Sequence, residues 1–305
     1  MTRGAAILLA ALALFALTAP WLAPYEAGEA FAGFLHAPPM RPHLDGLSPV
    51  VHPLVLADRL EQRFESDPSR TVKLPWVERD AAAPVFLLGA DDFGRDVLSR
   101  LLYGARTSIS LALVATLGAV LIGALAGAWA GYRGGWVDDV LGRVMDVLLA
   151  FPGILLAIAL VAVLGPSLRN VVLALAVIGW VGYARLVRGQ VLKIRELEYV
   201  QAARAMGAPI TRVLVRHVVP ATFSSVTVQA TLGMAGAIIA EASLSFLGLG
   251  VQPPTASWGT MLDAGRSHLF EAPHLTIVPG FAIAVLVMGF NFAGDALRDR
   301  FDPRL

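Results

Sequence analysis

The chain contains no cysteine. This absence excludes disulfide bonds, thiolate metal sites and cysteine nucleophiles. Lysine is nearly absent as well, because it occurs only at Lys73 and Lys193. Neither lysine follows a glycine or precedes a serine or threonine, so the phosphate-binding loop G-x-x-x-x-G-K-[ST] is missing. Any ATP hydrolysis that serves this protein must therefore come from another chain.

Charge is also scarce, since only 15% of the 305 residues are charged whereas 56% are hydrophobic. Soluble domains carry about 25% charged residues, so the composition predicts a polytopic membrane protein. The formal net charge of +1 indicates no strongly acidic or basic partner. The sequence has no H-E-x-x-H pair and no G-x-S-x-G turn. We therefore predict no catalytic residue and no metal site, and a membrane-bound enzyme is disfavoured.

Six runs are long and apolar enough to cross a bilayer, which takes roughly 20 residues. They cover approximately Ala5–Leu22, Ile109–Ala130, Val144–Leu164, Val171–Val187, Val218–Ala240 and Thr276–Gly294. The first run could be a signal peptide, because Arg3 precedes it, but no small-x-small site ends it, and we expect an uncleaved span. The fold class is therefore predicted to be all-α, with six transmembrane helices.

The orientation follows from the polar segment between the fourth and fifth spans. Residues 185–217 carry seven basic side chains and two acidic ones. Short basic loops stay on the cytoplasmic side, so this loop is predicted to be cytoplasmic. With six spans, the N- and C-termini then also face the cytoplasm.

We divide the chain into a first transmembrane helix (1–22), an extracytoplasmic insert with an interfacial helix (23–106) and a five-helix core (107–305). The insert holds nine of the 19 prolines. Within it, Val50–Leu56 and Val72–Val77 could be strands around a helical piece, Ala57–Phe64. A long loop ordered only against the membrane domain fits the prolines equally well.

Three aspartates stand in the stretch of residues 88–96, just before the second span. They lack the alternate spacing and the closing glutamate of a calcium loop, so calcium is disfavoured. We predict instead that Asp92 caps an interfacial helix, with Leu98, Leu101 and Leu102 towards lipid or protein and Arg95 and Arg100 towards water.

Within the spans, small residues recur every fourth position in the second run and predict a seam for close helix packing. Pro152 and Pro220 each remove a backbone hydrogen bond and are expected to kink their helices. Asp139, Arg143 and Asp146 stand at helical spacing and could pair on one face near a span end.

The basic loop is predicted to hold two short helices joined by a tight turn. The first ends at Met206, Gly207 takes a left-handed cap position, and Pro209 begins a second helix over Ile210–Val219. Alanines leave one side of the first helix nearly bare, so that the groove of another protein can close on it. A DNA-binding helix-turn-helix is disfavoured, because both helices are tied to membrane spans.

The segment after the fifth span is broken by glycine and proline, yet it is too apolar for a solvated loop. A re-entrant or interfacial element on the outer side fits such a segment, and it is our candidate for a lid or vestibule. The candidate outer-gate residues are Glu241, Ser245, Phe246, Gly248, Gly250 and Trp258.

The basic loop resembles the inner-membrane permease subunits of ATP-binding-cassette importers. Their signature has Glu-Ala-Ala, three residues, Gly, nine residues, then Ile-x-Leu-Pro. Here Gln201-Ala202-Ala203 precedes Gly207 at that spacing, and Val219-Pro220 closes it. Gln201 replaces the glutamate, and His217 stands where isoleucine is usual. Residues 88–100, 241–259 and 291–303 are similar to the peptide/nickel branch of this family.

The resemblance implies a subunit of a prokaryotic inner membrane that forms half of a translocation path for di- or oligopeptides. It implies four kinds of partner: a homologous second permease, two cytoplasmic ATPases that hold ATP and Mg, an extracytoplasmic substrate-binding protein and membrane lipid. No nucleic acid and no cofactor of its own are expected. The residues implied to couple to the ATPase are Glu198, Tyr199, Gln201, Ala202, Ala203, Arg204, Gly207 and Pro220.

Two alternatives remain open from the sequence. The same architecture could import nickel chelates, glutathione or oligosaccharides. A self-powered secondary transporter is more distant, since it predicts inverted repeats and functional charges in mid-membrane, and the sequence displays neither.

Overall fold

A computed structural model describes residues 14, 18–46, 48–58, 62–77 and 83–301. The chain divides into two compact units. The first comprises Met1–Ala10, Leu111–Ala240 and Leu286–Leu305, and the second comprises Ala11–Ser110 and Glu241–Val285. The first unit contains the helical core and the basic loop, and the second contains the insert and the segment 241–259.

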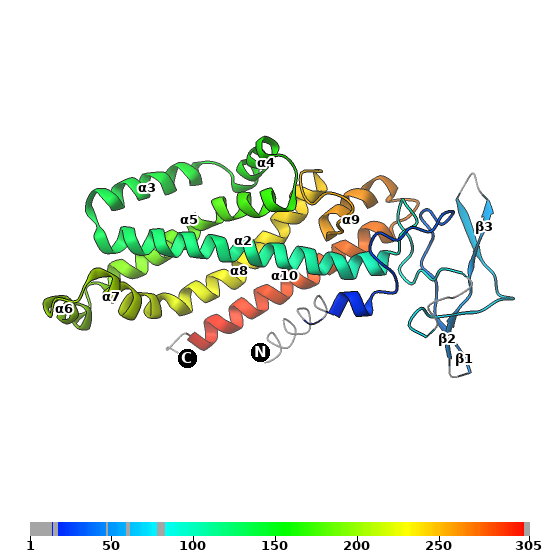
Figure 1. Cartoon of the computed structure of the whole chain (residues 1–305), viewed down its shortest axis with the longest axis horizontal. Coiled ribbons are helices and arrows are strands. Elements are labelled where there is room, and N and C mark those ends of the chain that lie inside the picture. The colour runs from blue at the N-terminus through cyan, green and yellow to red at the C-terminus, as the bar shows by residue number, and fades with distance from the viewer. Residues whose placement is uncertain (1–13, 15–17, 47, 59–61, 78–82, 302–305) are drawn as a thin grey trace. The chain divides into compact units, whose positions relative to one another are not determined.

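Most of the described chain is helical (Figure 1). The long helices are α2 (Val97–Arg133), α3 (Gly135–Ala150), α4 (Gly153–Leu164), α5 (Leu168–Ile194), α8 (Val219–Phe246) and α10 (His274–Phe301). The short ones are α6 (Glu198–Ala205), α7 (Ile210–Val213), η1 (Leu214–Val218), α9 (Trp258–Gly265) and η2 (Arg266–His268).

Four described helices are long and apolar enough to span a membrane: Val97–Arg133, Leu168–Ile194, Ile210–Phe246 and His274–Phe301. A fifth span is possible if α3 and α4, which meet at 90°, cross the membrane as one broken span. Of the 18 residues of the predicted first span, Ala5–Leu22, only six (14 and 18–22) are among the described residues. The described chain therefore carries four or five of the six predicted spans.

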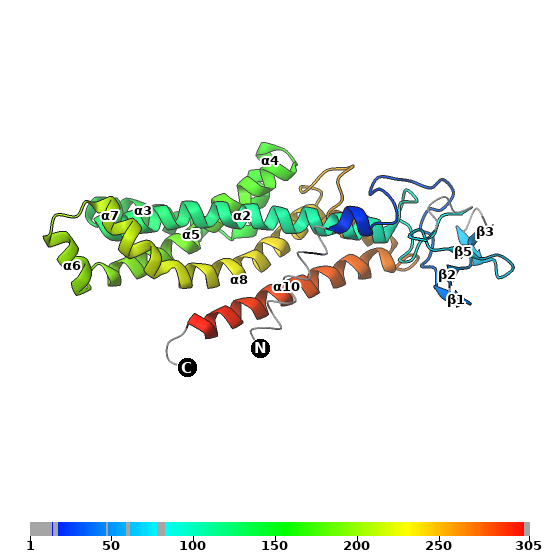
Figure 2. The same cartoon turned by 60° about the horizontal axis from the view of Figure 1, so that its bottom comes forward.

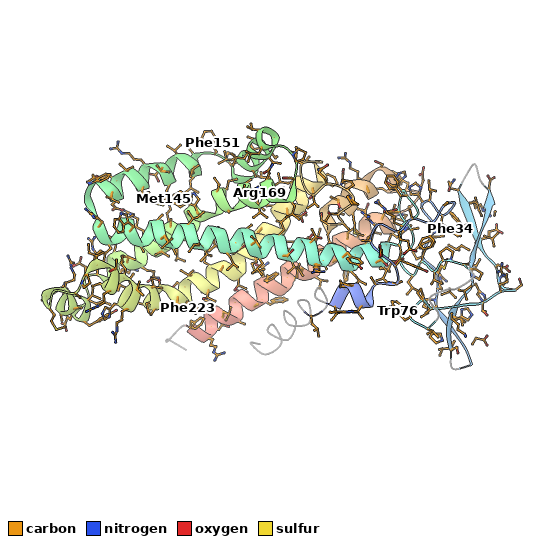
Figure 3. All side chains as sticks on the ribbon, viewed as in Figure 1. Phe34, Trp76, Met145, Phe151, Arg169 and Phe223 are labelled. Carbon is orange, nitrogen blue, oxygen red and sulfur yellow. The ribbon has the colours of Figure 1, made fainter. Side chains whose placement is uncertain are left out.

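The predicted third span, Val144–Leu164, is broken at Pro152. Proline disfavours helical backbone at the residue before it, and Phe151 is accordingly extended, with φ −97° and ψ 138°. Helix α3 ends at Ala150, and α4 starts at Gly153 with a new direction (Figure 3 labels Phe151 at this break). Instead of the kink that the sequence predicts, the helix is interrupted, and α3 and α4 meet at 90°.

Pro220 has a milder effect. The N–H of Val219 donates to the carbonyl of Leu214, which is one residue wider than an α-helical bond. This π-type turn absorbs the missing donor of Pro220, and the chain passes from α7 through η1 into α8 without a break.

The predicted small-residue seam of α2 packs against α5 in the first unit. A Cβ at Gly123 would lie 2.4 Å from the carbonyl oxygen of Trp180, and one at Gly127 would lie 2.3 Å from that of Ala184. Only hydrogen fits at either position, so the two helix backbones are in direct contact. Figure 1 shows α2 and α5 running alongside each other. This contact confirms the packing role of the seam.

The insert of the second unit forms two small antiparallel sheets. One has the order β1 (His43–Asp45), β2 (Ser48–Val51), β5 (Val72–Lys73), and the other pairs β3 (Leu54–Asp58) with β4 (Arg63–Ser66). The predicted helix Ala57–Phe64 is wrong where the chain is described, because Ala57 belongs to β3 and Phe64 to β4. Cross-strand pairing, such as Leu56 opposite Phe64, overrides local helix propensity here. The fold is therefore mostly helical rather than all-α.

The predicted strands are shorter than expected. Pro53 separates β2 from β3, because proline has no donor for a sheet, and β5 ends at Lys73. A core forms beneath both sheets, with Val51 and Phe86 fully buried. Phe34 stacks on Phe64, with ring centroids 6.1 Å apart, over this core (Figure 3).

The separate interfacial helix predicted before the second span is not formed in residues 83–133. Helix α2 begins at Val97 and continues to Arg133. Its cap is Asp96 rather than Asp92, because Asp96 Oδ2 accepts bonds from the Ser99 N–H (2.8 Å) and hydroxyl (2.7 Å). Interfacial segment and span are one helix.

Candidate functional site

The turn between the two short helices of the basic loop forms where the sequence predicts it. The second helix is shorter than predicted, because α7 covers only Ile210–Val213 and the chain then continues through η1 into α8. Helix α6 ends at Ala205 with Met206 as its C-cap, and Gly207 follows with φ +78°, a conformation that suits glycine. Pro209 precedes α7, whose first turn needs no proline N–H. We call residues 195–218 the α6–α7 loop, and Figures 1 and 2 show it beyond the ends of α2 and α5.

One side of α6 is anchored in the first unit. Val200 is fully buried and Ala203 nearly so. Val200 packs in a cluster with Val187, Val191, Ile194, Val213 and Val218, which belong to α5, α7 and η1. Ala203 is buried as well, so it does not lie on the bare, outward side of the helix that the sequence predicts for it, because its spacing from Val200 places both residues on the buried side of α6.

The other side of α6 is exposed. Glu198, Gln201, Ala202, Arg204 and Gly207 all lie on the surface. Pro220, at the start of α8, is exposed as well. The loop also exposes large apolar side chains, and Met206 has 82% of its area accessible. The others on this surface are Tyr199, Ile210, Val215 and Val219.

Two arginines fix the loop and its base to the neighbouring helices. Arg195 Nη1 donates to the carbonyl of Gly131 at 2.9 Å, near the end of α2. Arg188 on α5 makes a two-pronged pair with Asp138 on α3. The loop is therefore held by both packing and charge-assisted hydrogen bonds.

The acidic residues of α3 pair across helices rather than along one face. Asp146 pairs with Arg185 of α5, not with Arg143 as the spacing suggests. Because α3 and α5 pack together, arginines on α5 reach the carboxylates before those on α3 itself. These charges stabilise the helix pair at the surface.

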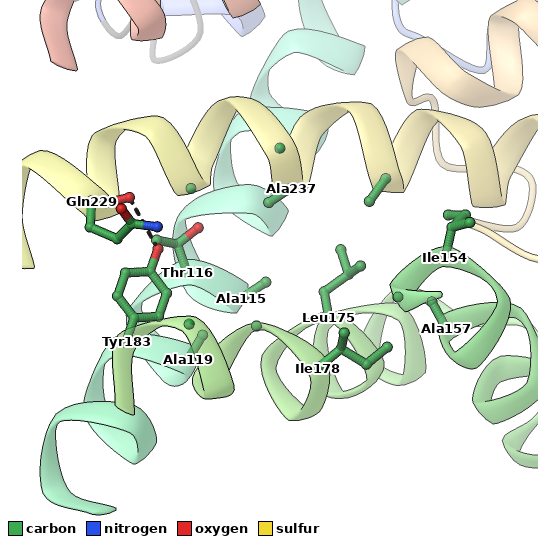
Figure 4. Close-up of a pocket in the computed structure, with 16 residues that line it drawn as sticks. Ala115, Thr116, Ala119, Ile154, Ala157, Leu175, Ile178, Tyr183, Gln229 and Ala237 are labelled. Carbon is green, nitrogen blue, oxygen red and sulfur yellow. Dashed lines mark hydrogen bonds between the residues drawn. The ribbon is translucent and has the colours of Figure 1, made fainter. Parts of the chain in front are cut away.

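A cavity of about 330 Å³ lies between α2, α4, α5 and α8 in the first unit (Figure 4). Its walls are mostly glycine and alanine. Three polar side chains face it, and they are Thr116, Tyr183 and Gln229. The hydroxyl of Tyr183 donates to the Gln229 carbonyl at 3.5 Å. The sequence does not predict this cavity, because the small residues of α2 that line it, Ala115 and Ala119, are equally explained by close helix packing.

The segment 241–259 builds a buried cluster in the second unit. Glu241 is wholly inaccessible and accepts hydrogen bonds from Ser245 at 2.7 Å and Ser108 at 3.2 Å. The N–H of Trp258 donates to Ser108 Oγ at 3.3 Å, and its indole N–H donates to the Leu101 carbonyl at 2.9 Å. Ser257 caps α9 through a reciprocal bond pair with Thr260.

The six candidate outer-gate residues are therefore divided. Glu241, Ser245, Gly250 and Trp258 are brought together and buried. Phe246 and Gly248 lie at the surface, where Arg266 sits over the Phe246 ring at 5.2 Å. The four buried residues form a packed cluster in which the Glu241 carboxylate has hydrogen-bond partners, and only Phe246 and Gly248 are accessible.

The loop before α2 differs from the prediction in its charges. Arg95 and Arg100 do not point to water, because both pair with the buried Asp91, at 2.8 Å and 3.1 Å. Asp92 contacts His36 at 3.0 Å instead of capping a helix. Burial raises the pKa of Asp96 to about 6.

Comparisons with known proteins agree on one family. The model described as "Binding-protein-dependent transport system inner membrane component" matches residues 119–305, more than half of the chain. The dipeptide transport system permease protein DppC of Alkalihalophilus pseudofirmus is 44% identical over 241 residues, covering 79% of this chain and 77% of that protein. The glutathione transport system permease protein GsiD of Pectobacterium atrosepticum is 47% identical over 218 residues, covering 72% of each.

Solved structures share the fold at lower identity. A chain of an amino acid ABC transporter has a TM-score of 0.52 at 16% identity, covering 66% of this chain and 94% of its own. A chain of the MetNI methionine ABC transporter, in an inward-facing conformation, has a TM-score of 0.51 at 17% identity, covering 67% and 97%. At these identities the likeness concerns the fold alone.

Proposed function

This chain belongs to the family of binding-protein-dependent transport system inner membrane components, and on that premise we propose that it is the permease subunit of an ABC importer for di- or oligopeptides. The relatives named for dipeptide and glutathione transport support this cargo, because glutathione is itself a small peptide. Nickel chelates and oligosaccharides remain as alternative cargoes of the same architecture. The subunit sits in the inner membrane with both termini in the cytoplasm.

The observation that carries the proposal is the surface of the α6–α7 loop. The chain has no phosphate-binding loop, so the work of transport must enter from a separate ATPase. The loop presents exposed apolar side chains, Tyr199 and Met206 among them, next to the small Ala202. Exposed apolar surface of this kind is typical of a protein–protein contact. The loop thus has the properties of a docking site.

The buried side of α6 connects the α6–α7 loop mechanically to the membrane-spanning helices. Val200 is packed against residues of α5 and η1, and η1 continues directly into α8. A load applied to the exposed side therefore passes to two spanning helices rather than bending a free loop. The cavity between α4, α5 and α8 leaves these helices room to shift, which a fully packed core would not.

The assembly follows from the same premise. A second, homologous permease supplies the other half of the path, two cytoplasmic ATPases bind ATP and Mg, and an extracytoplasmic protein delivers the peptide. This chain itself performs no catalysis. Cargo selectivity rests mainly with the delivering protein.

The test compares two glycines with the same local constraint. Gly207 and Gly165 both have positive φ, at +78° and +89°, and a Cβ at either meets nothing within 4 Å. Gly207→Asp should abolish ATP-driven peptide uptake in proteoliposomes while the subunit remains folded. Gly165→Asp, at the turn between α4 and α5, carries a large backbone strain of its own, because the ψ of 150° lies in a region almost confined to glycine, and it should retain most uptake. Equal uptake by both variants would contradict the docking role.

A further inference from the structure

Two histidines and an aspartate from three distant segments meet in the second unit. His36 lies in the insert, Asp92 in the loop before α2, and His268 in η2. Their ligand atoms, Nε2 of each histidine with a carboxylate oxygen of Asp92, all lie within 4.8 Å of one another. Nothing in the transport function proposed above requires this cluster.

We propose that His36, Asp92 and His268 form a binding site for a divalent transition-metal ion of the Zn²⁺ class, which ties the insert to the chain after α9.

The distances suit a common coordination centre. Asp92 Oδ1 lies 3.0 Å from His36 Nε2 and 3.8 Å from His268 Nε2. Ligands of a tetrahedral zinc, bound at about 2.0–2.1 Å, are separated by roughly 3.3 Å. Both separations lie within about 0.5 Å of this value, and all three ligand atoms lie within 4.8 Å of one another.

The ring nitrogens are oriented for this role. His268 Nδ1 lies 3.4 Å from Glu271 Oε2, and in the tautomer that donates this hydrogen bond the Nε2 lone pair is free to bind a metal beside Asp92. A carboxylate behind a histidine is the usual second partner of a metal-bound imidazole. The two imidazoles lie together, with ring centroids 4.1 Å apart.

The backbone of His36 is held in an uncommon conformation. Its φ is +54°, in the left-handed region that residues other than glycine rarely adopt. The His36 N–H donates to the Asp91 carbonyl at 3.1 Å, and this bond places the imidazole beside Asp92. A strained residue held against a carboxylate is typical of a ligand site rather than of a solvated loop.

The donor set selects the metal. Two imidazole nitrogens and one carboxylate suit Zn²⁺, Ni²⁺ or Cu²⁺, whereas Ca²⁺ and Mg²⁺ prefer oxygen ligands alone. The three side chains are 21–28% exposed, so an ion can enter and keep water in its remaining positions.

An ion here would stabilise a part of the chain that needs it. The insert has a small core under two short sheets, and the chain has no cysteine to form a disulfide. Domains of this size commonly rely on a metal or disulfide for stability. One ion would add His268 to two segments that are already linked through the His36 N–H and the Asp91 carbonyl, and its binding free energy would add to the stability of the unit.

The test uses the full chain in detergent, purified without a polyhistidine tag and stripped with chelator. After equilibration with Zn²⁺ and dialysis, elemental analysis should find at least one Zn²⁺ per chain. His36→Gln and His268→Gln should each lose one equivalent or weaken its binding at least tenfold. The control His217→Gln, which changes a histidine of the first unit, should lose none.

A second readout does not depend on stoichiometry. Zn²⁺ should slow proteolysis of the insert in the wild type and in His217→Gln, but not in His268→Gln. The His268 side chain is partly exposed, so its replacement should leave the chain folded. Zn²⁺ binding that survives both His36→Gln and His268→Gln overturns the proposal, as does a wild-type chain that binds none.

Discussion

Two glycine-containing segments of this chain stand in opposite situations. At Gly207, in the α6–α7 loop, an added Cβ would meet nothing within 4 Å. At Gly250, in the segment 241–259, it would lie 1.8 Å from Ser245 Oγ and 2.4 Å from Ser245 Cα. One segment leaves space and exposed apolar surface, where we propose that another protein docks, whereas the other satisfies its polar groups internally. Similar turn chemistry thus accompanies an open surface in one place and a buried, closed cluster in the other.

The largest effect is expected where the space is already filled. Gly250→Ala places a methyl against the backbone of Ser245, which a side-chain rotation cannot relieve. We expect a loss of about 3 kcal/mol or more in the free energy of unfolding, or failure to accumulate in the membrane. The measurement is thermal unfolding in detergent. Gly236→Ala in α8, where a Cβ meets nothing within 4 Å, is the control. Equal stability of the two variants would refute the close packing of Gly250 against Ser245.

The two sides of α6 should respond differently to truncation. Val200→Ala removes fully buried methyl groups and should lower the free energy of unfolding by about 2 kcal/mol. Tyr199→Ala removes an exposed ring and should change stability by less than about 0.5 kcal/mol, while weakening co-purification with the ATPase. Unfolding temperature and co-purification are measured on both. The opposite pattern would mean that the inner and outer sides are misassigned.

A smaller effect is expected from Asp96, in the closed region before α2. Burial raises its pKa to about 6 in the folded chain, against about 3.9 in the unfolded chain. The folded state therefore holds the proton more tightly, and stability should fall as pH rises from about 4 to about 6, by on the order of 2 kcal/mol or less.

Asp96→Asn should remove this pH dependence and keep the cap of α2, because asparagine caps equally well. Unfolding temperatures at pH 4.5 and pH 7 give the comparison. Asp67 is the matched control, since its exposed carboxylate has a pKa lowered by hydrogen bonds from Ser69, and Asp67→Asn should leave the slope unchanged. A slope that survives in Asp96→Asn would assign it to another group.

The parts predicted correctly from sequence are those fixed by local signals. Gly207 and Pro209 define the turn between α6 and α7 within a few residues, and the small residues of α2 predict close packing by spacing alone. The resemblance to importer permeases rests on these local motifs as well. Local chemistry also located the break at Pro152, though not its angle.

The parts that were missed depend on partners far along the chain. The β3–β4 hairpin replaced a predicted helix, because its stability comes from pairing. Arg95 and Arg100 face Asp91 rather than water, because Asp91 lies in the loop before α2 and helical spacing alone does not reveal a buried carboxylate there. The meeting of His36 with His268 likewise joins residues that no spacing rule connects. Ala203 turned inward because Val200 directs that side of α6 to the core.

The absence of cysteine permits a direct test of the central claim, which is that the α6–α7 loop receives work from a separate ATPase. Met206→Cys places a single thiol at a side chain that is 82% exposed, and Phe270→Cys places one at a fully exposed side chain of the second unit. In membranes that contain the whole importer, a short thiol-reactive cross-linker should join Met206→Cys to the ATPase, with a yield that changes when ATP is added. Phe270→Cys should give no such product. If Met206→Cys fails to cross-link to the ATPase in an importer that transports peptide, the account is contradicted.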